Sequence, residues 1–261
     1  MGVNKPKSIT EKTATLAVKT ILVTQPKPEA EKSPYFDIIT RFKVKIDFRE
    51  FIHIEGIDVK ELRKERLNLP DYTAIILTSR NAVDHFFRVC KEMRYQVPDT
   101  LKYFCISEST AYYLQKYVQF RKRKIFHGKQ KFVELMDVIK KHKEENYLLP
   151  CSDIVNKEIS KLLDEQKINY QKAVFYKTVA SDLSDLTNVN YDMLVFFSPS
   201  GVESLIKNFP KFKQNVTRIA AFGTSTAQAI KKAGLRLDVQ APMPNAPSMT
   251  MALEHYLKAN K

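Results

Sequence analysis

The same series of strand and helix patterns occurs twice in this sequence, and the two copies start at different points of the series. AIILTSRNAVDHFF at 74–87 is similar to MLVFFSPSGVESLI at 193–206, at an offset of 119 residues. CISESTAYYL at 105–114 is similar to AFGTSTAQAI at 221–230, at an offset of 116 residues. Two copies of one long series predict two domains of the same architecture.

The rotation of the repeat predicts that one domain interrupts the other. TILVTQ at 20–25 is similar to YLLPCS at 147–152, at an offset of about 126 residues, so only one copy is continuous. The chain must therefore leave the first domain, build the second and return. Both crossings have extended patterns, which favours a two-stranded β linker, a cleft between the domains and hinge motion. The predicted layout is a discontinuous domain at 1–50 plus 180–261, a continuous domain at 53–178, and linkers near 51–53 and 178–180.

Short apolar runs alternate with helical patterns along most of the chain. This alternation predicts an α/β fold in which helices cover a parallel sheet. The strands are nearly continuous apolar runs, as expected of strands buried on both faces. Ten strands are many for one open sheet, so we expect two flavodoxin-like domains, each with a parallel five-stranded sheet flanked by helices. The candidate strands are 21–24, 43–48, 74–78, 103–106, 125–127, 147–150, 172–176, 193–197, 218–222 and 236–239.

The net charge narrows the class of partner. The 43 Lys and Arg residues exceed the 29 Asp and Glu residues and give a formal charge of +14. Such a protein attracts anions, which include nucleic acids, acidic membrane surfaces and small molecules with several acidic groups. Charge alone does not choose among these classes.

Several features predict a cytoplasmic protein. No apolar run approaches the ~18 residues of a membrane helix, and residues 1–19, expected to form a short mobile tail, lack the apolar core of a signal peptide. The three cysteines, Cys90, Cys105 and Cys151, are far apart and form no CxxC pair. We expect them to be free buried thiols in a reducing compartment.

Segments rich in Ser and Thr follow four of the predicted strands. Ligands of open α/β sheets bind outside the carboxyl ends of the strands, where helix N-termini favour anions. Four such segments at equivalent places in two repeats would form two arrays of hydroxyl and amide groups suited to carboxylates or phosphates. Ordinary helix N-capping explains the same residue types. The four segments are 78–81, 107–110, 198–201 and 223–226.

Motifs for other chemistries are missing or weak. The sequence has no GxGxxG, GxxxxGK[ST] or GxSxG, and its five histidines show no metal-ligand spacing, so we expect no metal and read the histidines as structural or surface residues. The basic run Arg121–Lys124 is most often a solvated loop, although such a run can also bind nucleic acid. Tyr176 ends a strand beside the predicted hinge, which makes it the one phenol of interest.

The ordered series of segments resembles the uroporphyrinogen-III synthase family. The resemblance spans about residues 20–258 and is carried by ILVTQPKPEA, ILTSRNAVDHF, NYLLPCSDIVNKEI, VFYKTV, VFFSPSGVESL, IAAFGTSTAQAIKKAGL and VQAPMPNAPSMTMALEHYL. The resemblance implies two HemD-like α/β domains, one of them discontinuous, joined by a two-stranded linker. It also implies a lyase without a cofactor that cyclises hydroxymethylbilane to uroporphyrinogen III, inverts ring D and releases water in tetrapyrrole biosynthesis.

The resemblance implies partners and site residues as well. The substrate carries eight carboxylates, and hydroxymethylbilane synthase, which supplies it, is the implied transient partner of a monomer that binds neither nucleic acid nor membrane. The tyrosine of the family's VYxT motif falls on Tyr176, the implied catalytic residue at the leaving hydroxyl. The implied substrate-binding residues are Ser79, Asn81, Thr110, Ser198, Ser200, Arg218, Ser225 and Thr226.

Two departures from the family pattern keep other interpretations open. Gln25 stands where an arginine is usual, and Glu108 adds negative charge near the first TA motif. These residues motivate an alternative in which a homologue binds tetrapyrroles without turnover. The charge and Arg121–Lys124 motivate a second alternative, a nucleic-acid-binding α/β protein whose affinity would fall steeply with salt.

Overall fold

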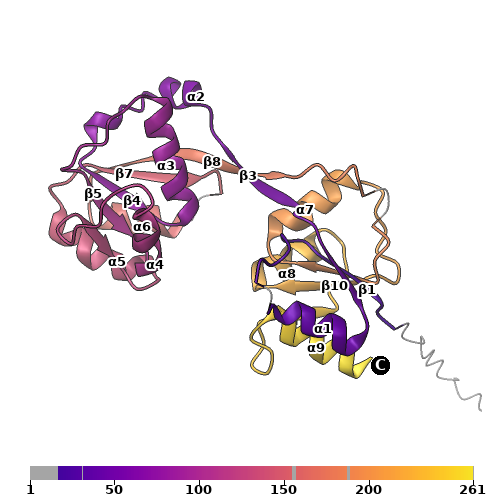
Figure 1. Cartoon of the computed structure of the whole chain (residues 1–261). Helices are drawn as coiled ribbons and strands as arrows, with labels where there is room; N and C mark the ends of the chain where they lie inside the picture. Colours follow the sequence, from indigo (N-terminus) through magenta and orange to yellow (C-terminus); the bar gives the residue numbers. More distant parts are fainter. Residues whose placement is uncertain (1–16, 31, 155–156, 187–188, 261) are drawn as a thin grey trace, which may run out of the picture. The chain divides into compact units, whose positions relative to one another are not determined.

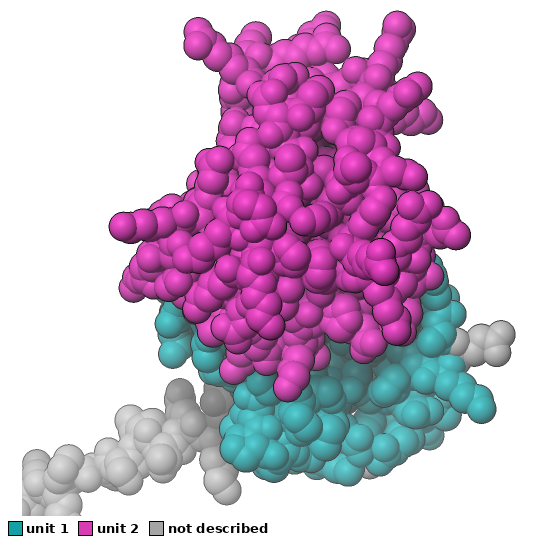
Figure 2. All heavy atoms as spheres, turned by 90° about the vertical axis from the view of Figure 1, so that its left-hand side faces the viewer, with its two compact units in different colours: residues 1–52, 180–261 teal, residues 53–179 magenta. Residues whose placement is uncertain are grey.

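The computed structural model describes residues 17–30, 32–154, 157–186 and 189–260. The expected tail at 1–19 lies almost entirely outside these residues, as do residues 155–156 of the segment NYLLPCSDIVNKEI. The chain forms two compact units, shown in separate colours in Figure 2. Unit 1 consists of residues 1–52 and 180–261, and unit 2 of residues 53–179. Among the described residues, no helix is long and apolar enough to cross a membrane.

Unit 1 has a parallel five-stranded sheet in the order β11-β10-β9-β1-β2. Strand alternation sends Ile21 and Val23 into one apolar cluster and Leu22 into the other. Helices α1 and α9 cover the first face, and α7 and α8 the second, as the ribbon in Figure 1 shows. The elements are β1 (Thr20–Val23), α1 (Pro34–Phe42), β2 (Lys45–Phe48), β9 (Met193–Phe196), α7 (Pro199–Asn208), β10 (Arg218–Phe222), α8 (Thr224–Lys232), β11 (Val239–Ala241) and α9 (Met249–Ala259).

Unit 2 has a six-stranded sheet in the order β3-β8-β7-β4-β5-β6, in which β8 to β6 pair in parallel. Helices α3 and α4 pack on one face around Phe86, and α5 and α6 pack on the other around Phe104. The strands are β3 (Ile52–Gly56), β4 (Ala74–Leu77), β5 (Lys102–Cys105), β6 (Ile125–His127), β7 (Tyr147–Ser152) and β8 (Tyr170–Ala180). The helices are α2 (Val59–Lys64), α3 (Arg80–Glu92), α4 (Glu108–Leu114), α5 (Phe132–Ile139) and α6 (Lys157–Glu165), with 3₁₀ turns at Leu69–Asp71 and Lys140–His142.

The predicted α/β class with parallel strands is confirmed, but five strands in each sheet is wrong for unit 2. The sixth strand is β3, which lies next to β8. Its residues from His53 to Gly56 are all exposed, so it lacks the apolar run that marks a buried strand. It is a strand because its backbone pairs with the edge of the sheet, which local sequence does not reveal. The chain changes units inside these two strands, at Ile52/His53 and at Val179/Ala180.

Candidate active site

The carboxyl edge of the unit 2 sheet brings Ser79 and Tyr176 together. Ser79 follows β4 as the N-cap of α3, and its Oγ accepts a hydrogen bond from the backbone N–H of Ala82 at 3.1 Å. Tyr176 lies on β8 opposite Ser152, the last residue of β7. The Tyr176 hydroxyl is 3.2 Å from Ser79 Oγ, and either oxygen can donate. Two predicted site residues that are 97 positions apart in the sequence therefore form one hydrogen-bonded pair.

The environment of Tyr176 keeps its phenol protonated. The residue is 6% exposed, and this burial raises the pKa of the phenol, which the hydrogen bond to Ser79 only partly offsets. Ser79 already accepts the N–H of Ala82, so its own O–H is free to donate to the phenol oxygen. In that arrangement the phenol O–H is left to donate to a bound ligand. The N-terminus of α3 then stabilises negative charge that develops on the phenol oxygen.

A histidine that we had read as structural or surface contacts this phenol. His85 lies on α3, and its ring stacks on Tyr176 with centroids 5.0 Å apart and planes 18° apart. Burial, followed by the nearby charge of Arg88, lowers the pKa of His85. The ring against Tyr176 is therefore neutral at pH 7.

The other two predicted residues of unit 2 differ in their access to solvent. Asn81 is exposed in the first turn of α3. Thr110 is buried in the first turn of α4, and its Oγ1 lies 3.1 Å from Oγ of Ser107, the N-cap of that helix. The hydroxyl of Thr110 thus forms a hydrogen bond with the N-cap side chain of α4. Glu108, the departure from the family pattern, is exposed beside it.

Unit 1 carries four of the predicted residues on two neighbouring helices, α7 and α8, which pack together. Ser198 is the N-cap of α7, where its Oγ accepts the N–H of Gly201 at 3.2 Å, and Ser200 follows in the same turn. Ser225 is exposed in the first turn of α8, and Thr226 is buried there. Within the described residues the buried Oγ1 of Thr226 has no hydrogen-bond partner. These helix starts follow adjacent strands, so the structure brings this set together.

Arg218, the remaining predicted residue of unit 1, lies apart from this set. It is the first residue of β10, whereas α8 follows the last residue, Phe222. A strand of this length puts about 13 Å between its two ends. Arg218 is buried, and its charge helps to lower the pKa of Asp192. The charge of Arg218 therefore acts on a carboxylate at the amino edge of the sheet.

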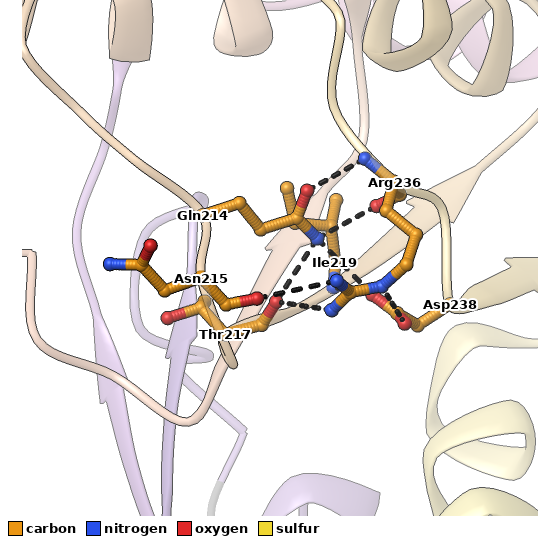
Figure 3. A network of polar contacts seen from close by, with 6 residues as sticks. All are labelled: Gln214, Asn215, Thr217, Ile219, Arg236 and Asp238. Atoms are coloured by element: carbon orange, nitrogen blue, oxygen red, sulfur yellow. Dashed lines mark hydrogen bonds and ion pairs between the residues drawn. The ribbon is translucent and has the colours of Figure 1, made fainter. Parts of the chain in front are cut away.

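A polar network at the same amino edge of unit 1 is also structural. The side-chain amide of Gln214 donates to the carbonyls of Thr217 and Arg236, as Figure 3 shows. Arg236 Nε donates to Asp238 Oδ1 at 2.7 Å, and the backbone N–H of Ile219 donates to Asp238 Oδ2 at 2.8 Å. These contacts fasten the loop before β10 to the segment before β11. Gln214, Arg236 and Asp238 contribute side chains to the network, and Asn215, Thr217 and Ile219 contribute backbone atoms.

Two features of unit 2 could attract ions, and both lie away from the carboxyl edge that holds Ser79 and Tyr176. The carboxylates of Glu144 and Glu145 and the ring of His142 bring possible metal ligands within 4.8 Å of one another. Lys102 already pairs with both carboxylates, so we assign no metal there. The basic run Arg121–Lys124 borders a hollow of about 360 Å³ at the amino ends of β5 and β6, the edge opposite Ser79.

The three cysteines are free and buried, as predicted. Burial raises the pKa of Cys90 and Cys105 to about 12 and that of Cys151 to about 11. Because the thiolate is the nucleophilic form, none of the three is suited to nucleophilic catalysis at pH 7.

Comparison with known families decides the identity of the fold. The sequence model of the family described as uroporphyrinogen-III synthase HemD matches residues 46–251. This chain belongs to the uroporphyrinogen-III synthase family. A search of curated protein sequences finds no match.

Solved structures of uroporphyrinogen-III synthases share the fold at low sequence identity. The enzyme from Helicobacter pylori 26695 has a TM-score of 0.57 and 19% identity, covering 93% of this chain and all of its own. A mutant enzyme from the extreme thermophile Thermus thermophilus has a TM-score of 0.53 and 13% identity, covering 93% and 100%. At this distance the likeness shows the fold and leaves the role of each residue to the local geometry.

Sequence reasoning on the uroporphyrinogen-III synthase motifs missed His85 and Arg88. A usable signal existed, because Ser79, Ala82, His85 and Arg88 recur every third residue at and after the helix start. Residues three positions apart are neighbours on the surface of a helix, so each residue of this series lies beside the next. Without the knowledge that β8 lies against His85 and Arg88, nothing separated them from residues of an ordinary amphipathic helix.

Proposed function

We propose that this enzyme of the uroporphyrinogen-III synthase family cyclises hydroxymethylbilane with Tyr176 as the acid at the leaving hydroxyl. The observation that carries the proposal is the buried Tyr176 phenol, paired with Ser79 at the start of α3. Burial favours the protonated phenol, and a protonated phenol is the form that can donate to a hydroxyl.

The proposed reaction is a cyclisation that releases one molecule of water. The Tyr176 hydroxyl donates its proton to the terminal hydroxyl of the substrate as the carbon–oxygen bond breaks, and water departs. The substituted carbon of ring D, which is electron-rich, then attacks the resulting electrophilic carbon and gives a spiro intermediate. The bond from that ring carbon to its original methylene bridge breaks and re-forms at the free α carbon of ring D, which inverts the ring. The proton that the closing macrocycle releases restores the phenol, so the sum is hydroxymethylbilane to uroporphyrinogen III and water.

Groups at the helix starts are the proposed contacts for the substrate carboxylates. Ser200 and Ser225 make no side-chain hydrogen bond to any described residue, and they lie in the first turns of α7 and α8. Exposed hydroxyls and unpaired N–H groups at such positions favour anions. Asn81 holds the equivalent place in α3. The formal charge of +14 supports attraction of a substrate with eight carboxylates.

The test separates the product isomers. Freshly generated hydroxymethylbilane is incubated with and without the protein, and the oxidised type I and type III uroporphyrins are separated by chromatography. Because the free substrate closes spontaneously to type I, mainly type III product supports the proposal. Type I alone in the presence of folded protein would refute turnover and favour the non-catalytic homologue.

A further inference from the structure

All three nitrogens of the Arg88 guanidinium donate hydrogen bonds in the surroundings of Tyr176. Nε donates to Nδ1 of His85 at 3.1 Å. One terminal nitrogen donates to both carboxylate oxygens of Glu92, at 2.9 and 3.0 Å. The other donates to the carbonyls of Ile57 and Phe175, at 3.0 Å each. A planar guanidinium can satisfy this set, whereas a lysine has three donors around a single point charge.

The contact with Arg88 fixes the proton on His85. A guanidinium is always charged and has no acceptor, so Nδ1 of His85 must accept the hydrogen bond. The ring proton is therefore on Nε2. A second proton on Nδ1 would point at a donor of the same charge. Arg88 thereby keeps the ring that stacks on Tyr176 neutral and in one tautomer.

The same guanidinium fixes the backbone next to Tyr176. The carbonyl of Phe175, the preceding residue, accepts from Arg88 at 3.0 Å and from the N–H of Ile57 at 2.9 Å. The carbonyl of Tyr176 accepts from the N–H of Asp153 at 3.2 Å. Tyr176 is thus held at its backbone on both sides, at its ring by His85 and at its hydroxyl by Ser79.

Gly56 leaves the room that this arrangement needs. A Cβ at position 56 would lie 2.6 Å from Cζ of Arg88, closer than side chains tolerate. The guanidinium cannot move aside without losing several of its hydrogen bonds. The end of β3 is therefore shaped around the Arg88 side chain.

We propose that Arg88, acting through His85, is a positioning residue that holds Tyr176 in the orientation for proton donation. The inference rests on the proposed function, since it assigns Arg88 a role in the same step. Neither residue needs to touch the substrate. A small displacement of the donor oxygen suffices to lower the rate, because proton transfer depends on hydrogen-bond geometry.

The kinetic test compares Arg88→Lys with the control Arg63→Lys. Arg63 is an exposed residue of α2 whose side chain makes no hydrogen bond or ion pair with any described residue. We expect Arg88→Lys to lower kcat about 10- to 100-fold with KM changed less than about twofold, and Arg63→Lys to leave both within about twofold. In a Tyr176→Phe background, Arg88→Lys should change kcat less than about twofold, because its target is gone. An equal loss in both backgrounds would refute action through Tyr176.

A second measurement does not depend on turnover. Nitrogen-15 NMR of the histidine rings, with His85 assigned by its loss in His85→Gln, should show the neutral Nε2–H tautomer at pH 7. Arg88→Lys should give a mixture of tautomers. A ring protonated on Nδ1 or on both nitrogens in the native protein would overturn the inference. If Arg88→Lys fails to fold, Gly56→Ala displaces the guanidinium from outside and should give the same two signatures.

The outcomes separate this inference from the proposed function. Full activity of Tyr176→Phe would overturn the role of Tyr176 and the positioning role together. A slow Tyr176→Phe with a normal Arg88→Lys would overturn the positioning role alone. Failure of the native protein to form the type III isomer would refute the function, while the NMR result would still decide the tautomer.

Discussion

Replacement of Ser79 by alanine should cost more stability than the matching replacement of Ser198. Both serines cap a helix through one N–H···Oγ bond, of 3.1 Å in α3 and 3.2 Å in α7. Loss of such a cap costs about 1 kcal/mol. Ser79 also pairs with the hydroxyl of the buried Tyr176, and an unpaired buried hydroxyl adds about 1 kcal/mol. We therefore expect about 2 kcal/mol for Ser79→Ala and about 1 kcal/mol for Ser198→Ala.

Urea unfolding followed by far-ultraviolet circular dichroism measures both free energies of unfolding. The decisive quantity is the coupling in a double-mutant cycle of Ser79→Ala with Tyr176→Phe. If the pair contributes as the geometry implies, the excess cost of Ser79→Ala over Ser198→Ala disappears when Tyr176 is phenylalanine. Equal costs for the two serine variants, with zero coupling to Tyr176, would show that the 3.2 Å contact contributes nothing.

Three further outcomes follow from the described geometry. Tyr176→Phe should lower kcat by about 100-fold, as for a lost general acid, with little change in KM in steady-state assays; an unchanged rate would leave this phenol a packing residue. Gly223→Ala should lower the free energy of unfolding of unit 1 by roughly 1–2 kcal/mol in urea unfolding. Residue 223 has a φ of 87°, and an added Cβ would meet no other atom, so backbone strain is the only expected cost. An unchanged free energy of unfolding would contradict this strain. Burial raises the pKa of Asp192, but hydrogen bonds from Lys19 and Thr20 and the charge of Arg218 lower it overall. A lowered folded pKa gives stability that is present above the unfolded pKa of about 3.9 and is lost as pH falls through the folded value. In the Asp192→Asn variant, the free energy of unfolding should therefore fall less as the pH is lowered. A variant with the same pH dependence of unfolding as the native protein would contradict this prediction.

The strands and helix starts of the sheets were predictable because their signals are local. The strand at Ile125–His127 has the predicted bounds, and Ser79 and Ser198 follow apolar strands as N-caps do. Ordinary capping, the alternative held for these serines, describes one of their roles correctly. For Ser79 it is incomplete, because the same oxygen also meets Tyr176.

The sixth strand of unit 2 and the surroundings of Tyr176 depend on tertiary contacts that a single sequence does not reveal. β3 pairs through its backbone, and the stack of His85 on Tyr176 joins two elements that are distant in the chain. Arg218 is a different case, because a residue that opens a parallel strand lies at the edge opposite the following helix. The placement of Arg218 at that edge was therefore predictable from the strand pattern.

The interrupted layout of unit 1 sets an order of events during synthesis. Unit 2 is continuous, so all of its residues are synthesised before β9 to β11. Until then β1 and β2 form at most an isolated strand pair, which is only marginally stable in water. The edge of β1 that later pairs with β9 remains exposed during this time. At a synthesis rate of roughly 5 to 20 residues per second, the edge of β1 remains unpaired for roughly 10 to 30 s before β9 is made. The nascent chain is therefore most exposed to aggregation, and most dependent on chaperones, through the segment that holds β1 and β2.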